Sequence, residues 1–192
     1  MLTEKNTAEV QSASRASRAI GSMFFSVFGG CWLVVWSLGA YGVKFGMLGA
    51  IGVCSVAILL AAIKQFRDNR VAYAKEAESP ASKRAGRIFN VVNAIQWVLI
   101  FIVSTLLKKA GHWEWIIPSV ILIVGVHFFP LGMAFRVRRH YLTGGALILV
   151  AVLYPLMAKY GPKAPVGCLG TGLILWLSAI GALIPQLNPK EA

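Results

Sequence analysis

Long apolar runs alternate with short polar segments along the whole chain, and nearly all of the ionisable residues lie in the polar segments. Each run has 18 to 22 residues. A helix needs roughly 20 residues to cross the hydrocarbon core of a bilayer. The pattern therefore predicts an all-α polytopic membrane protein, a bundle of six transmembrane helices. The predicted spans are 20–40, 45–63, 88–107, 115–135, 141–158 and 166–187.

The polar segments predict how these helices are connected. Residues 1–18 are expected to form a frayed or surface-lying tail, and short turns join most of the spans. The longest connection is the basic loop 64–87, whose first half is rich in helix formers and should continue the second span as a helix. Pro80 should stop that helix, because the residue before a proline avoids the helical region. The spans then form one transmembrane domain, 19–187, with no room for a separate soluble domain.

The distribution of charge predicts the orientation of the chain. Hydrophobic residues make up 57% of the sequence and charged residues 14%, yet the formal net charge is +12. If the N-terminus is inside, fourteen Lys and Arg residues lie on the inner side and five on the outer side. This is the positive-inside pattern, so both termini are expected to be cytoplasmic, in a bacterial inner membrane. The basic character indicates topology and contact with anionic lipids, and nucleic acid is not an expected partner.

Arg136, Arg138 and Arg139 form a dense basic group in the connection between the fourth and fifth spans. They are candidate contacts for anionic lipid or for phosphate. A basic inner loop also follows from topology alone, without any bound ligand. Both interpretations stay open.

The apolar runs lack the residues that carry most membrane chemistry. All seven Asp and Glu residues lie outside the predicted spans, which disfavours proton- or sodium-coupled transport through a buried carboxylate. The chain has no nucleophilic serine motif, no HExxH pair, no acidic cluster for magnesium and no phosphate-binding loop. Its three cysteines do not have metal-ligand spacing. No metal, no cofactor and no enzymatic activity are therefore expected.

One histidine lies inside an apolar run. His127 is eight residues from the inner end of the fourth span, or roughly 12 Å at 1.5 Å per residue. Asn90, Asn93 and Gln96 follow one another in steps of three on the third span and reach a similar depth. Two interpretations compete. The four side chains form a clasp between helices, with Pro130 kinking the fourth span below it, or they line a polar cavity that binds a small molecule.

Small residues predict where helices approach one another closely. Gly42, Gly46, Gly49 and Gly52 share one face of the second span. That arrangement favours close packing against another helix over a glycine-lined pore. If the face is exposed, it would also support a homo-oligomer.

Two tryptophans lie deeper in the predicted spans than an interfacial belt of aromatic residues would. Trp97 is in the third span and Trp176 is in the last. Both are interpreted as core residues, and each indole N–H then needs a hydrogen-bond acceptor.

Residues 127–145, HFFPLGMAFRVRRHYLTGG, resemble an uncharacterised family of small bacterial integral membrane proteins. Members share a His-Phe-x-Pro-Leu stretch, a short loop and then Tyr-x-Thr-Gly. The segment GTGLILWLSA at 170–179 is similar to the last span of that family, and the resemblance covers about the last 70 residues. It implies a membrane location and places His127 and Pro130 in the family's motif. It implies no reaction, because the family has no established activity.

Three functional hypotheses follow from the sequence. The first is small-molecule transport or permeation through a polar intramembrane cavity around His127, Gln96 and Asn93. The second is a non-catalytic structural or regulatory membrane protein that acts through lipid or protein partners at its basic face. The third, a membrane enzyme, is disfavoured because neither a nucleophile nor a metal cluster is evident. No feature of the chain identifies the ligand.

Overall fold

Six long α-helices make up almost all of the protein. The computed structural model describes residues 2–184, which form six α-helices and two short 3-10 helices. The 3-10 helices, η1 (Trp113–Trp115) and η2 (Gly161–Lys163), lie in the turns before α4 and α6. In chain order the α-helices are α1 (Leu2–Tyr41), α2 (Phe45–Ala77), α3 (Pro80–Lys109), α4 (Ile116–Phe135), α5 (Arg138–Met157) and α6 (Val166–Leu183).

All six helices contain a stretch that is long and apolar enough to cross a membrane. These stretches coincide with the apolar runs of the sequence. The all-α fold and the presence of six candidate spans are therefore confirmed. By the length and composition of its helices, the chain is a multi-pass membrane protein.

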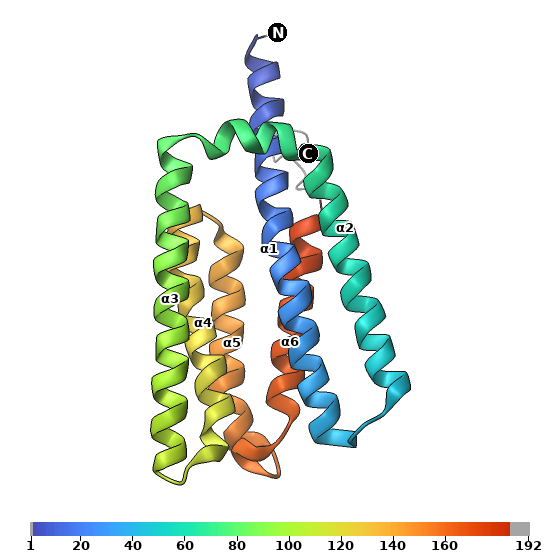
Figure 1. The fold of residues 1–192 in the computed structure, drawn as a ribbon, viewed down its shortest axis with the longest axis vertical. Coiled ribbons are helices and arrows are strands. Elements are labelled where there is room, and N and C mark those ends of the chain that lie inside the picture. The colour runs from blue at the N-terminus through green and yellow to red at the C-terminus, as the bar shows by residue number, and fades with distance from the viewer. Residues whose placement is uncertain (1, 185–192) are drawn as a thin grey trace.

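The helices pack in the spatial order α2, α1, α6, α5, α4 and α3, so that α2 and α3 lie farthest apart in the row (Figure 1). The two outer helices bury few side chains. Ile51 and Ala62 are the buried residues of α2, and α3 has none among the residues that the structure describes. Large apolar side chains such as Val53 and Phe101 are instead exposed. Apolar faces of this kind are suited to contact with lipid.

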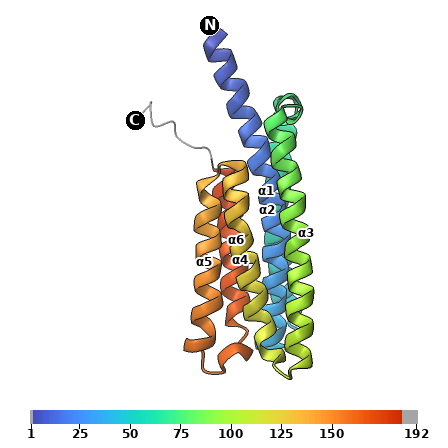
Figure 2. The same cartoon turned by 90° about the vertical axis from the view of Figure 1, so that its left-hand side faces the viewer.

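The connections gather at two ends of the bundle, and one end is strongly basic. This basic end holds the start of α1, the α2–α3 and α4–α5 connections and the end of α6 (Figure 1, top; Figure 2). The last turns of α2 and the start of α3 run across it. Five lysines lie at the opposite end, near the other three turns. The described Lys and Arg side chains of the basic end are Arg15, Arg18, Lys64, Arg67, Arg70, Lys75, Lys83, Arg84, Arg87, Arg136, Arg138 and Arg139.

The segment predicted as a frayed tail, residues 1–18, is helical from Leu2 and continues into the first span without a break. That prediction was wrong for a physical reason. Ala13, Ala16 and Ala19 follow one another in steps of three and are buried, and α1 packs along α2. Small side chains on one face allow a second helix to approach, and this packing stabilises a polar sequence as helix.

The predicted extension of the second span is confirmed, because α2 is helical through Ala77. The Ser79 hydroxyl then accepts a hydrogen bond from the Ser82 N–H at 3.1 Å, and Pro80 occupies the first turn of α3. A proline fits that position because its missing N–H would have no helical partner there. The third helix thus begins eight residues before its predicted start. The predicted end of the last span, 185–187, lies outside the described residues.

Glycines let backbone approach backbone at two helix crossings. A Cβ atom on Gly125 of α4 would lie 3.0 Å from the carbonyl oxygen of Gly144 on α5, and one on Gly144 would lie 2.7 Å from that of Gly125. Gly29 of α1 and Gly172 of α6 face each other in the same reciprocal way. Backbone meets backbone at both crossings, as small-residue packing in membranes requires.

The glycine face predicted on the second span takes no part in such a crossing. Cβ atoms on Gly46, Gly49 and Gly52 would meet nothing within 4 Å. The prediction that this face packs against another helix is therefore wrong within a single chain. A homo-oligomer through this face stays a prediction.

Candidate functional site

His127 lies in the third turn from the end of α4 and is half-buried. Its Nδ1 atom is 2.7 Å from the Val124 carbonyl oxygen of its own helix. A hydrogen bond there requires the tautomer in which Nδ1 carries the proton, so that Nε2 is left as an acceptor. The ring lies against Phe128, with 4.6 Å between the ring centroids.

The amides expected beside His127 lie on α3, which packs against α4 as predicted. Asn90 is exposed, whereas Asn93 and Gln96 are half-buried. Among the described residues, no hydrogen bond joins these three side chains to His127. The Gln96 Oε1 atom is buried and has no hydrogen-bond partner. The structure thus brings the two helices together without forming the expected clasp.

A second histidine, His140, packs against the same phenylalanine as His127. The His140 ring is 5.8 Å from that of Phe128 and 6.2 Å from that of Phe25, centroid to centroid. Phe25 and Phe128 are in turn 5.5 Å apart. These four residues, His127, Phe128, His140 and Phe25, form an aromatic cluster that joins α1, α4 and α5. His140 was assigned to a polar loop, but α5 begins at Arg138, which turns the imidazole into the bundle.

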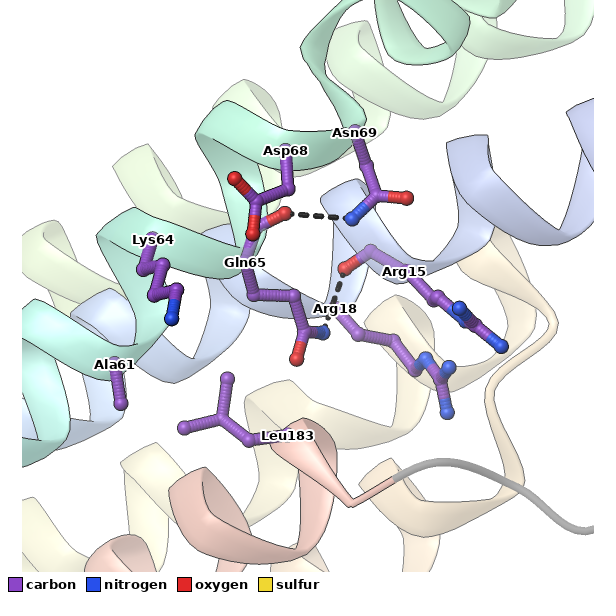
Figure 3. Close-up of a pocket in the computed structure, with 8 residues that line it drawn as sticks. All are labelled: Arg15, Arg18, Ala61, Lys64, Gln65, Asp68, Asn69 and Leu183. Carbon is purple, nitrogen blue, oxygen red and sulfur yellow. Dashed lines mark hydrogen bonds between the residues drawn. The ribbon is translucent and has the colours of Figure 1, made fainter.

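A cavity lined by charged groups opens at the basic end, between α1, α2 and the end of α6 (Figure 3). Its volume is about 300 Å³. The Gln65 amide crosses it and donates from Nε2 to the Arg15 carbonyl oxygen at 3.1 Å. The Asn69 Nδ2 atom donates to the Gln65 carbonyl oxygen at 2.8 Å. The pocket is lined by Arg15, Arg18, Ala61, Lys64, Gln65, Asp68, Asn69 and Leu183.

Arg18 is the most confined charge of this pocket. Its Nε and Nη1 atoms are buried and have no hydrogen-bond partner. The neighbouring charges that act on its guanidinium are those of Arg15 and Arg139, which are also positive. We call these three residues the arginine cluster. It brings like charges together from α1 and α5, beside the end of α6.

The three arginines predicted to contact lipid have different environments. Arg136 and Arg138 are exposed. Arg139 is half-buried and donates from Nη1 to the carbonyl oxygen of Gly181, in the last turn of α6. The carbonyls at the end of a helix carry partial negative charge, so a guanidinium there stabilises the helix end. Arg136 itself ends α4 with a positive φ of 55°.

Hydroxyl groups connect the helices one turn further into the bundle. Thr143 Oγ1 of α5 lies 2.8 Å from Ser178 Oγ of α6. Thr143 also donates to the Arg139 carbonyl oxygen at 3.1 Å, so the Ser178 hydroxyl donates in the bond between the two. On the other side of α6, the Ser22 hydroxyl donates to the Ala179 carbonyl oxygen at 3.0 Å. These bonds fix the arginine cluster relative to α1, α5 and α6.

Within residues 2–184 no group of three His, Cys, Asp or Glu side chains is placed to hold a metal ion. The fold and this basic pocket define a six-helix membrane protein with a cationic end. Comparison with known proteins found no matching family model, no similar curated protein and no similar solved structure.

Proposed function

We propose that this chain is a non-catalytic protein of the bacterial inner membrane that acts through its basic end. In this proposal both termini face the cytoplasm, and the basic end binds the anionic headgroups of the inner leaflet. The protein then organises or reports on lipid, or recruits partners to it, and carries out no chemical reaction.

The observation that carries the proposal is the charge difference between the two ends of the bundle. Twelve described Lys and Arg side chains lie at the basic end and five at the other. A basic residue close to an anionic leaflet contributes roughly 1 kcal/mol to the attraction. The last turns of α2 cross this end (Figure 1). Arg70 and Lys75 of this helix are exposed and would belong to the surface that faces the headgroups.

The test is to extract the protein with its surrounding lipid, in polymer-bounded discs, from a membrane of mixed neutral and anionic phospholipid. We expect the wild-type discs to be enriched in anionic lipid relative to the bulk membrane. The variant Arg136→Glu/Arg138→Glu should reduce that enrichment, because both side chains are exposed at the basic end.

The matched control is Lys108→Glu/Lys109→Glu, which reverses two exposed charges at the opposite end. It should lower the enrichment less. Equal lipid composition in wild-type discs and in the bulk membrane would rule the proposal out.

Small-molecule permeation past His127 is a second candidate function, and one observation favours it. The buried Gln96 Oε1 atom has no hydrogen-bond partner, and a buried polar group without a partner is costly. A ligand or water molecule that donates to this oxygen would remove the cost. The test is to measure uptake of candidate metabolites into vesicles that contain wild-type protein or His127→Ala; equal uptake by both would exclude this function.

A further inference from the structure

We propose that Arg15 and Arg18, the two members of the arginine cluster that line the pocket between α1, α2 and α6, bind a phosphate group there. The inference rests on the proposed function and deepens it, because it assigns the attraction to a built site in place of a diffuse surface. The ligand is a phosphate monoester or diester, either in a lipid headgroup or in a soluble anion.

Among the described residues, the Arg18 guanidinium lacks a counter-charge. Two nitrogen atoms of the Arg18 guanidinium are buried without a hydrogen-bond partner. Burying a charge is costly unless an opposite charge or hydrogen bonds compensate for it. A phosphate in the pocket, which Arg18 lines, would bring an opposite charge close to this guanidinium.

The directions of the arginine side chains also favour a bound anion. Figure 3 shows the side chains of Arg15 and Arg18 extending in the same direction, away from Lys64. Arg139 of α5 does not line the pocket, and its Nη1 atom is already bound to the Gly181 carbonyl oxygen of α6. Guanidinium groups bind phosphate oxygens through several N–H groups at once. Because Gln65 holds the backbone of Arg15, the cluster is positioned before any ligand arrives.

The size and the position of the pocket are suited to a phosphate group. Its volume of about 300 Å³ is at the small end of the range for small-molecule sites, roughly 300 to 1,000 Å³. Ala61 and Leu183 form apolar parts of the lining, and they belong to helices that are long enough to span a bilayer. A phosphate bound here would sit level with lipid headgroups and next to apolar helix surfaces.

Asp68 is the one acidic side chain of the lining and opposes an anion. It forms no ion pair with the other described residues. With Arg15, Arg18 and Lys64 present, the lining still carries a net positive charge. The carboxylate therefore lowers the affinity for phosphate without abolishing it, and it offers a variant whose effect has the opposite sign.

The experiment measures thermal unfolding of the purified full-length chain in a neutral detergent. One arm titrates a short-chain phosphatidylglycerol, and a second arm titrates inorganic phosphate. A ligand that binds the folded state raises the unfolding temperature in a saturable way. Saturation by the lipid alone identifies a headgroup site, and saturation by both identifies a general phosphate site.

Three variants locate the binding. Arg18→Gln should weaken the apparent affinity about tenfold, because a charged donor to phosphate is replaced by a neutral one. Arg15→Gln tests the same cluster with an exposed side chain and provides the answer if the Arg18 variant fails to fold. Asp68→Asn should strengthen binding. Arg84→Gln, an exposed basic residue of α3 at the same end, is the matched control and should leave affinity unchanged.

Three results would overturn the inference: no saturable stabilisation of the wild type by either probe, equal affinities for wild type and both cluster variants, or an effect of Arg84→Gln as large as theirs. In each case enrichment of anionic lipid in extracted discs still decides the proposed function independently. Loss of that enrichment would refute the proposed function, whereas its persistence would leave the basic end as a diffuse lipid-binding surface.

Discussion

Gly29 of α1 and Gly172 of α6 face each other across the helix crossing nearest the middle of α6, flanked by the side chains of Trp176 and Leu33. A Cβ atom on Gly172 would lie 2.9 Å from the Gly29 carbonyl oxygen, and one on Gly29 would lie 3.1 Å from the Gly172 carbonyl oxygen. Helices that approach this closely gain dispersion contacts that lipid cannot match. The crossing therefore sets the distance between α1 and α6.

Gly172→Ala should destabilise the protein, because the new methyl group overlaps with the Leu33 side chain and the Gly29 carbonyl oxygen of α1. Overpacking of this kind typically costs about 1 to 3 kcal/mol. The matched control is Gly21→Ala on α1, where a Cβ atom meets nothing within 4 Å. There alanine should be neutral or stabilise the helix by up to roughly 1 kcal/mol. Unfolding in detergent would show the difference, and equal stabilities would contradict the crossing.

Gly49→Ala on α2 tests the predicted homo-oligomer, because a glycine face that binds a second copy would lose close contact. If the exposed glycines of α2 mediate self-association, Gly49→Ala should shift the protein from oligomer to monomer in size-exclusion chromatography with light scattering. An unchanged oligomeric state would remove this face as the interface.

The bond between Thr143 and Ser178 should contribute measurably to stability. Their hydroxyl oxygens lie 2.8 Å apart between α5 and α6. In membrane proteins such bonds contribute on average about 0.6 kcal/mol and at most roughly 1.7 kcal/mol. A double-mutant cycle with Thr143→Val and Ser178→Ala should show a coupling free energy of that size. Strictly additive effects of the two substitutions would mean that the bond does not form.

The aromatic cluster should depend on Phe128 more than on any exposed phenylalanine. Its ring is buried and contacts the rings of Phe25, His127 and His140. Phe128→Ala removes these contacts and should lower the free energy of unfolding by roughly 3 kcal/mol. Phe101, which is 72% exposed on α3, is the control. If Phe101→Ala were equally harmful, the ring packing would not be the cause.

Trp176 and Trp97 show what the sequence could and could not predict. Both were interpreted as core residues that need an acceptor. Trp176 does donate its indole N–H to the Ser26 carbonyl oxygen at 3.2 Å, whereas Trp97 is 53% exposed on α3. Trp176→Phe should therefore destabilise by about 1 kcal/mol, and Trp97→Phe should have almost no effect. The reverse order would contradict the packing of α6 against α1.

The contrast between Trp176 and Trp97 also holds for whole helices: their positions in the sequence were predicted, but their positions in the bundle were not. Hydropathy located each span along the chain, because residues in the hydrocarbon are predominantly apolar whichever neighbour they have. It could not tell which helices lie at the outside of the bundle. A lipid-facing side chain and a helix-facing side chain have the same polarity in a membrane, so the exposed faces of α2 and α3 have no separate signature.

The candidate site was only partly predictable for a related reason. The depth of His127 followed from counting residues, but its neighbours depend on how α4 and α5 are rotated about their axes. The contact with His140 therefore had no sequence signal. The arginine cluster was missed because Arg15 and Arg18 belonged to a segment interpreted as a tail. Ala13, Ala16 and Ala19 of that segment follow one another in steps of three. This spacing of small residues indicates a packed helix and was the sequence signal for the position of the cluster.

The central claim is that the six helices span a membrane with the basic end in the cytoplasm, and cysteine labelling in intact bacterial cells tests it most directly. Cys31, Cys54 and Cys168 are first replaced by alanine, and single cysteines are introduced as Glu78→Cys at the basic end and Ala110→Cys at the opposite end. A membrane-impermeant maleimide should label residue 110 in intact cells and residue 78 only after permeabilisation. Labelling of residue 78 from outside, or of both positions alike, would contradict the account.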